Sequence, residues 1–296
     1  MYQQIAYNKR KTILLIAVFM MVVWAIGFAY ATLTDTGLSP LIAAGVFSVV
    51  MAIGGYYKGD AVALATAGAK GPISKNDNPY LYRMVENLSI TAGLPLPKIY
   101  VIADPAINAF ATGRDPKHAS IAVTLGAIEK LKNEELEGVL AHELSHIQNY
   151  DIRLMTIVIV LVGMIALLSD WFLRLTFHGG GRRDSRDGRA GAVLMVIGIV
   201  LLILSPIIAQ LIKLAISRKR EFLADASGSL LTRYPAGLAN ALEKISQEDM
   251  PVLRANNATA HLYLASPFGR KRHALASLFQ THPPIEQRIA RLRSMA

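Results

Sequence analysis

The sequence predicts an α+β soluble domain on a helical membrane anchor with about four apolar segments. Hydrophobic residues make up 53 % of the 296 residues, which is above the roughly 45–50 % usual for soluble domains. They gather in long blocks that are nearly free of charge. The stretches between and after these blocks instead mix helical and strand-like patterns with charged residues, as soluble α+β domains do.

The first two blocks predict a membrane hairpin in residues 1–58. Ile13–Leu33 is 21 residues long without a charge, and it follows the basic stretch 9–11, which places its amino end in the cytoplasm. The alternative is a cleaved signal peptide that ends at the "AYA" of residues 29–31. Its apolar region would exceed the usual ~7–15 residues, and a second run, Leu38–Tyr57, follows at once. We therefore expect an uncleaved anchor whose second helix returns the chain to the cytoplasm.

Residues 59–151 have the pattern of a soluble domain and form its first part. Asn78 and Gly93 bound a helix with one apolar face, because asparagine favours helix starts and glycine favours helix ends. Lys98–Ile102 and Ala119–Thr124 are rich in β-branched residues and predict strands. Asn133 is expected to cap a further helix, whose first turn carries two glutamates.

Residues 152–214 predict a second transmembrane or re-entrant hairpin. Leu154–Leu168 has only 15 residues, which is short for a span, whereas Ala192–Ile212 has 21. If both runs span, the arginine-rich loop between them lies outside, against the usual excess of basic residues in cytoplasmic loops. The opposite assignment would move a larger basic set, around residues 213–220, to the outside. We therefore place the loop outside.

Residues 215–296 are expected to complete the soluble domain and to end in a basic surface. The chain carries a net charge of +10, and from Pro251 onward one acid, Glu286, stands against seven basic residues (Arg254, Arg270, Lys271, Arg272, Arg288, Arg291 and Arg293). An anionic lipid surface is the expected partner. Nucleic acid is not, because no recognition module or aromatic stacking motif accompanies the charge. The sequence gives no indication of an oligomeric state.

The motif H-E-x-x-H predicts a metal site. His142 and His146 lie four residues apart and share one helix face, so both imidazoles can bind one ion, and Glu143 can hold the water of that ion. Chance alone produces this pattern in on the order of 1 % of chains of this length. The alternative is an ordinary helix with two histidines. The chain has no cysteine, so a metal site must use His, Asp or Glu.

A third ligand is available after the last apolar run. Glu221 and Asp225 also lie four residues apart, so Glu221 can bind the metal while Asp225 accepts a hydrogen bond from the back of a ligating imidazole. The alternative is a solvated helix with two exposed acids. We favour ligation because this segment directly follows the second hairpin, while the H-E-x-x-H helix directly precedes it.

These motifs together resemble those of the HtpX family of membrane-embedded zinc endopeptidases, relatives of the CAAX prenyl endopeptidases. The similar stretches are "INAFATGRDPKHASIAVTLG", "HELSHIQNYD", "REFLADASGS" and "THPPIEQRIARL". The resemblance covers nearly the whole chain and is weaker in the N-terminal hairpin and in residues 250–272. It implies a gluzincin-like zinc metalloprotease core.

The resemblance assigns roles to individual residues. It implies one Zn²⁺ per chain, held by His142, His146 and Glu221, with Glu143 as the general base and Asp225 as the carboxylate behind a ligand. His282 and Arg288 match a family element near the active site and are expected to help stabilise the oxyanion. Asn108 and Phe110 match the family's "NAF" segment at the cleft.

The expected activity is cleavage of polypeptides, in particular misfolded or damaged membrane proteins, at the cytoplasmic face of a bacterial inner membrane that the chain crosses several times. Ala119–Thr124 is expected to be an edge strand that pairs with extended substrate through Ser120, Ile121, Ala122 and Val123. The alternative class is a non-enzymatic metal-binding membrane protein or transporter. The apolar runs contain almost no paired charges, however, and a glutamate beside the first histidine is superfluous for binding alone.

Overall fold

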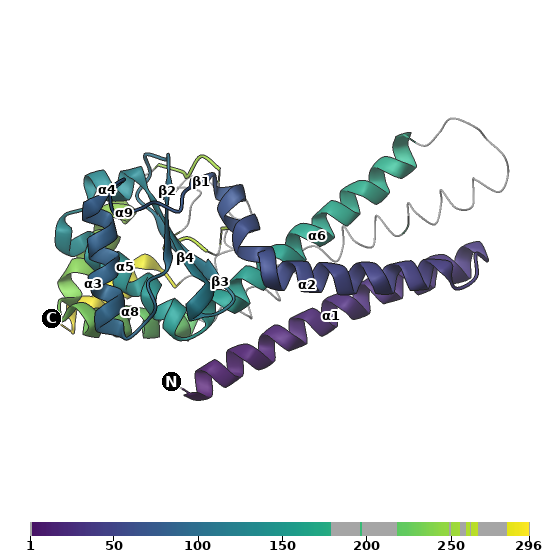
Figure 1. Ribbon diagram of the computed structural model, residues 1–296, viewed down its shortest axis with the longest axis horizontal. Coiled ribbons are helices and arrows are strands. Elements are labelled where there is room, and N and C mark those ends of the chain that lie inside the picture. Colours follow the sequence, from purple (N-terminus) through teal and green to yellow (C-terminus); the bar gives the residue numbers. More distant parts are fainter. Residues whose placement is uncertain are drawn as a thin grey trace.

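Two long apolar helices, α1 (Tyr2–Thr34) and α2 (Ser39–Ala67), form a hairpin at the start of the chain (Figure 1). The computed structural model describes residues 2–178, 196, 218–248, 250–254, 259–260, 262–265 and 283–295. Ile5–Thr34 and Ser39–Ala67 are each long and apolar enough to cross a membrane. Large apolar side chains such as Ile13, Met21 and Ile42 point away from the protein on these helices, as expected of a surface that faces lipid.

Helix α2 does not end with the predicted apolar run at Tyr57. It continues through Ala67 and stops at Gly68, which has a φ of +70° in the left-handed region that glycine favours. Its last turns bury Ala63, Leu64 and Ala67 against the sheet of the soluble domain. The second apolar helix is therefore long and apolar enough to cross a membrane and is also a core element of the soluble domain.

The soluble domain contains a four-stranded sheet with the order β1-β2-β4-β3. The strands are β1 (Ala69–Lys70), β2 (Lys98–Ile102), β3 (Ala109–Gly113) and β4 (Ala119–Thr124). Strand β4 runs parallel to β2, and β3 is antiparallel to β4. Both predicted strands are present, but the expectation that Ala119–Thr124 is an edge strand is wrong. The chain turns back through the 3₁₀ helix Pro116–His118, so β3 covers the outer side of β4 and is itself the edge.

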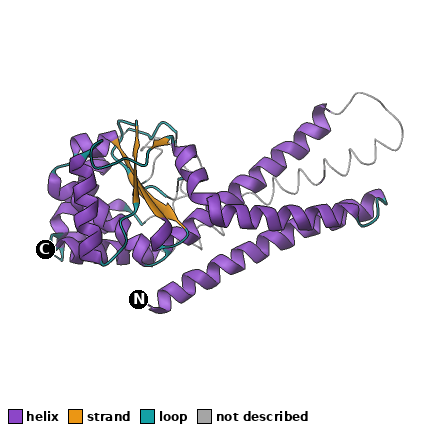
Figure 2. Cartoon of the chain, in the orientation of Figure 1, coloured by secondary structure: helices purple, strands orange, loops and turns teal. Residues whose placement is uncertain are grey.

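Helices cover both faces of this sheet (Figure 2). One face packs on α3 (Pro79–Ala92), α5 (Asn133–Gln148) and α9 (Pro235–Gln247), with Ala109, Ile121 and Val123 among its buried residues. The other face packs on the end of α2, the start of α6 (Asp151–His178) and the segment around Tyr263. The remaining helices are α4 (Leu125–Lys130), α8 (Arg218–Thr232) and α10 (Ile285–Arg293). The described residues thus form the expected helix-rich α+β arrangement with a small sheet.

The two predicted helix caps have different outcomes. The side chain of Asn78 accepts a hydrogen bond from the Leu81 N–H at 3.0 Å, and Gly93 ends α3 in the left-handed conformation, as predicted. Asn133, in contrast, is the first residue inside α5 and not its cap. Lys132 takes the cap position, where its backbone N–H is satisfied by the carboxylate of Glu135 at 2.7 Å.

Helix α6 leaves α5 at a sharp bend of 82°. Tyr150 lies at the bend with a φ of +60°, and α6 then runs for 28 residues, about 42 Å at 1.5 Å per residue. The predicted 15-residue limit of this segment was too short, because the helix continues past the polar residues that close the apolar run. Counted as one span, α5 and α6 would add a third crossing to those of α1 and α2. The fourth predicted segment, Ala192–Ile212, lies outside the described residues except for Val196.

Candidate metal centre

Helix α5 presents His142 and His146 on one face, as the four-residue spacing predicts. Their Nε2 atoms lie 3.1 Å apart, and both side chains are buried. Glu143 is on the next position of the same turn and is also buried. Two adjacent imidazole nitrogens and a carboxylate, all removed from water, require compensation by hydrogen bonds or by an ion.

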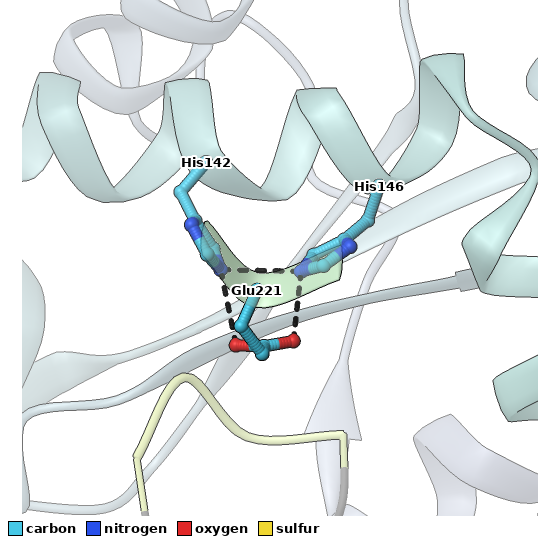
Figure 3. Close-up of side chains that lie close together, drawn as sticks. All are labelled: His142, His146 and Glu221. Atoms are coloured by element: carbon cyan, nitrogen blue, oxygen red, sulfur yellow. Dashed lines mark hydrogen bonds and ion pairs between the residues drawn. The ribbon is translucent and has the colours of Figure 1, made fainter. Parts of the chain in front are cut away.

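Glu221 on α8 completes a three-residue cluster (Figure 3). Its carboxylate oxygens lie 3.8 Å from His142 Nε2 and 3.6 Å from His146 Nε2. Tetrahedral zinc with ligand bonds of about 2.0–2.2 Å holds its ligand atoms roughly 3.3 Å apart. The observed separations therefore fit a single metal ion that needs only small movements of the side chains.

Carboxylates hold the opposite sides of both imidazole rings. His142 Nδ1 lies 3.0 Å from Asp225 Oδ1, and His146 Nδ1 lies 2.9 Å from Asp151 Oδ2. Each carboxylate accepts the Nδ1–H, so the Nε2 lone pair of each ring points towards Glu221. Asp225 thus has the position that its spacing predicted. The sequence reasoning missed Asp151, which stands five residues after His146 and immediately beyond the helix end.

Arg288 fixes Asp225 from behind. Its Nε and Nη2 atoms donate to the two carboxylate oxygens of Asp225 at 2.9 and 2.6 Å, and Nη1 donates to the Leu264 carbonyl at 2.8 Å. Nη1 also lies 3.7 Å from Glu221 Oε2. The guanidinium is fully buried, which is tolerated because it is paired on two sides. These contacts give Arg288 a positioning role beside the metal ligands.

The charges of the cluster call for a divalent cation. With neutral histidines, the carboxylates of Glu143, Glu221, Asp151 and Asp225 face two guanidinium groups, those of Arg220 and Arg288, which leaves two excess negative charges. A divalent ion would balance them. The donor set, its separations and its charge therefore all fit a metal ion.

The edge strand β3 passes beside Glu143. The backbone N–H of Ala111 donates to the Glu143 carboxylate. Two residues earlier in β3, Ala109 O accepts a hydrogen bond from the Leu264 N–H at 3.2 Å. The same N–H also donates to Asn108 Oδ1 at 3.0 Å. The outer edge of β3 thus contacts Glu143 at one position and the segment around Leu264 at another.

Comparison with known proteins identifies the family. Residues 75–296 match the family described as Peptidase family M48. The chain belongs to this family. It is 44 % identical over 297 residues to "Protease HtpX homolog" of Caldanaerobacter subterraneus subsp. tengcongensis, with 100 % of this chain and 98 % of the relative covered. A protein of the same name from Tropheryma whipplei is 45 % identical over 295 residues, with 100 % and 98 % covered.

The fold is shared with a solved structure. The crystal structure of S. mikatae Ste24p aligns with a TM-score of 0.51 at 20 % identity, over 99 % of this chain and 67 % of that chain. Membership of family M48 confirms the predicted enzyme class, a metalloprotease, over the non-enzymatic alternative. It also confirms the resemblance to HtpX proteins and to their relatives.

The ionisable groups of this M48 metallopeptidase respond strongly to burial. Burial raises the pKa of Glu143 to about 8, with a further increase from the charge of Glu221. Burial alone would lower the pKa of His146, but the hydrogen bond to Asp151 and the charge of Glu221 outweigh it and raise that pKa to about 9. The pKa of His142 falls to about 4, because burial outweighs the hydrogen bond to Asp225. The charge of Glu221 raises the pKa of both Glu143 and His146, so the cluster favours added positive charge.

The remaining predicted site residues have different surroundings in the M48 domain. Asn108 lies at the edge of β3 and faces Leu264, whereas Phe110 packs edge-on against Tyr263 on the other face of the sheet, with ring centroids 5.4 Å apart. The predicted substrate contacts Ser120, Ile121, Ala122 and Val123 are buried in β4, whose backbone pairs on both sides. His282 lies outside the described residues.

A glycine allows the two ligand helices to approach. A Cβ atom added at Gly228 of α8 would lie 2.9 Å from the backbone nitrogen of His142 on α5, which is closer than real Cβ contacts. Gly228 shares the helix face of Asp225, one turn away. The absence of a side chain there lets Glu221 and Asp225 reach the histidines.

Replacing Gly228 with alanine is therefore expected to push α8 away from α5 and to weaken metal binding, with a loss of about 1–3 kcal/mol in the free energy of unfolding, as for other overpacked sites. Metal content after dialysis and the thermal unfolding midpoint in detergent measure the two effects. Gly54→Ala is the matched control, because a Cβ atom at Gly54 meets nothing within 4 Å. Equal metal retention in both variants would contradict the close-approach role.

Proposed function

We propose that this M48 member is a membrane-bound zinc endopeptidase that cleaves misfolded or damaged membrane proteins at the cytoplasmic face of a bacterial inner membrane. The observation that carries the proposal is the junction of three elements: the metal cluster of His142, His146 and Glu221, the carboxylate of Glu143 beside it, and the outer edge of β3, the last strand of the sheet. Each supplies one requirement of peptide hydrolysis.

Zinc is the metal that the donor set favours, with one ion per chain. Two histidines and one glutamate are a common ligand set of catalytic zinc, which keeps one further position for water or substrate. When bound, the ion would lower the pKa of a ligated water to about 7 and polarise the scissile carbonyl. Asp225 and Asp151 would keep both imidazoles in the tautomer that offers Nε2.

Glu143 is the proposed general base. Its carboxylate would take a proton from the attacking water, whose oxygen bonds to the carbonyl carbon, and would pass that proton to the nitrogen of the leaving amine as the C–N bond breaks. The Ala111 N–H holds the carboxylate at the edge of β3, where a bound peptide would lie. The Ala111 N–H and a bound divalent ion would both favour the ionised carboxylate over the protonated form that burial favours, so that Glu143 could accept the proton.

Strand β3, and not β4, is the proposed substrate strand. An extended peptide could add to its outer edge through backbone hydrogen bonds, which give affinity with little sequence preference. The Leu264 N–H already binds this edge, at Ala109 O and at the side-chain oxygen of Asn108. A substrate would replace these contacts. Such binding requires an unfolded, accessible segment, which fits misfolded membrane proteins as substrates.

The oxyanion role implied for His282 and Arg288 is divided in this proposal. Arg288 donates two hydrogen bonds to Asp225 and a third to Leu264, so its charge serves to orient the metal ligands. His282 remains the proposed oxyanion donor. Phe110 belongs to β3, and its side chain holds the strand in place by packing against Tyr263 on the other face of the sheet. The β4 residues 120–123 support β3 by pairing with it inside the sheet.

The replacement Glu143→Gln tests the mechanism. We expect stoichiometric zinc and an unchanged fold, because the ligands are untouched, but a loss of at least about 100-fold in the rate of casein and membrane-substrate cleavage. Zinc analysis and gel-based degradation by detergent-purified protein measure both. Glu134→Gln, an exposed residue of the same helix, is the control. If Glu143→Gln digests casein at the wild-type rate, the general-base assignment is wrong.

The ligand assignment predicts a graded loss of zinc. Glu221→Ala should abolish tight binding, because two imidazoles alone make a poor site. Asp225→Asn should weaken affinity by about 10–100-fold, as is typical of residues that orient a ligand. Affinities from competition with a chelator, with exposed Glu129→Ala as the control, measure this order. Wild-type affinity in Glu221→Ala protein would place the third ligand elsewhere.

The proposed location follows from the hairpin of α1 and α2. Figure 1 shows the start of α1 and the soluble domain at the same end of this hairpin, and Asn8 of α1 contacts that domain. The basic stretch 9–11 favours the cytoplasmic side for this end. We therefore assign residues 59–151 and 215–296 to a cytoplasmic catalytic domain, and 1–58 and 152–214 to the anchor, with the end of α2 shared between them.

Reporter fusions test this topology. A fluorescent protein that folds only in the cytoplasm should be bright when fused after Ala296, and alkaline phosphatase should be inactive there. Phosphatase fused at Thr36, in the turn between α1 and α2, is the control and should be active. Strong phosphatase activity after Ala296 would overturn the topology. A phosphatase fusion within residues 179–188 should be active if the second hairpin spans, and inactive if it is re-entrant.

A further inference from the structure

Asn8 is a buried polar residue in an unexpected place. It stands on α1 directly before the basic stretch 9–11, where a surface position would be expected, yet only 1 % of it is exposed. Burying an amide without hydrogen-bond partners costs free energy. The hydrogen bonds of the Asn8 side chain therefore indicate its role.

The hydrogen bonds that the structure describes for the Asn8 side chain go to segments far away in the sequence. Its Nδ2 donates to Asn149 O at 2.9 Å and to Asp151 Oδ1 at 2.6 Å, and its Oδ1 accepts from Arg220 Nη1 at 2.8 Å. Arg220 in turn forms an ion pair with Asp151 Oδ1 at 2.5 Å. The amide therefore joins the first helix to the end of α5, the start of α6 and the start of α8.

Asp151 links this network to the metal cluster. Its other carboxylate oxygen, Oδ2, lies 2.9 Å from His146 Nδ1. A carboxylate bound through one oxygen alone can rotate about its side-chain bonds. With Oδ1 held by Asn8 and Arg220, Oδ2 is kept beside Nδ1 of His146 and helps to fix the orientation of that ring.

The bond from Asn8 to Asn149 acts on the backbone of the same region. Asn149 precedes Tyr150, the residue with positive φ at the 82° bend between α5 and α6. Lys9, the next residue of α1, lies over the Tyr150 ring with Nζ 5.0 Å from the centroid. The first helix therefore contacts the bend with two consecutive side chains.

We propose that Asn8 is a positioning residue of the metal centre, acting through Asp151 on His146. The first membrane helix is then part of the hydrolytic apparatus and not only its anchor. This inference rests on the proposed role of His146 as a metal ligand. It assigns a function to a residue 134 positions before the first ligand in the sequence, and it implies that a catalytic domain without α1 binds its metal less tightly.

The test uses full-length, detergent-purified protein with Zn²⁺ for affinity and Co²⁺ as a spectroscopic probe of ligand geometry. Asn8→Leu keeps the volume of the side chain but removes its hydrogen bonds. We expect about 10–100-fold weaker Zn²⁺ binding and an altered visible absorption of bound Co²⁺. Thr12→Val is the matched control, because Thr12 is buried one turn further along α1 and its hydroxyl donates within the helix, to Asn8 O at 2.9 Å.

A double-mutant cycle separates positioning from general packing. If Asn8 acts through the carboxylate, Asn8→Leu should have no further effect on Zn²⁺ affinity in an Asp151→Ala background. An equal effect in both backgrounds would overturn the proposal. So would wild-type affinity and an unchanged Co²⁺ spectrum in Asn8→Leu protein.

A second variant covers the case in which Asn8→Leu does not fold. Asn8→Asp has the same shape, but it loses the amide donor and places a carboxylate beside Asp151, so it should weaken Zn²⁺ binding at least as much. Unchanged binding in this variant would also overturn the proposal. Failure of the underlying site assignment gives a different result, namely wild-type protein that binds no Zn²⁺ or binds it equally well without Glu221.

Discussion

The structure depends on compensating a group of charges buried between α5 and α8. Both histidines, Glu143, Glu221, Asp225 and Arg288 are withdrawn from water, and uncompensated burial of such groups would cost far more than the few kcal/mol by which a domain is stable. Each is therefore held by a partner of opposite charge or by a hydrogen bond. A divalent ion would balance the two excess negative charges that remain, and His142, His146 and Glu221 are its candidate ligands.

This constraint explains why the ligand helices are so closely supported. Gly228 brings α8 into backbone contact with α5, and Arg288 from α10 closes the far side of Asp225. The sheet contributes a hydrogen bond, because the Ala111 N–H of β3 donates to the Glu143 carboxylate. Three separate segments of the chain thus converge on one turn of α5, namely parts of α8, α10 and β3.

The membrane helices and the soluble domain form one unit in this protein. Helix α2 ends in the core of the domain, and α6 begins on β3, where Thr156 bonds to Thr112 at 2.8 Å and to the Gly113 N–H at 3.0 Å. Helix α1 reaches the network behind His146 through Asn8. The metal cluster therefore lies where the soluble domain meets the apolar helices, which is the arrangement from which we propose membrane proteins as substrates.

The sequence by itself determined the local features of this protein. Spacing of four placed His142 and His146, and likewise Glu221 and Asp225, on common helix faces, because helix geometry depends only on nearby residues. Capping chemistry located α3, and β-branched runs located β2 and β4. Only the tertiary structure decided what depends on pairing between distant segments: that β3 covers the edge of β4, that Asp151 and Asn8 stand behind His146, and that α6 bends away from α5. These contacts join residues up to 212 positions apart, and no local propensity encodes them.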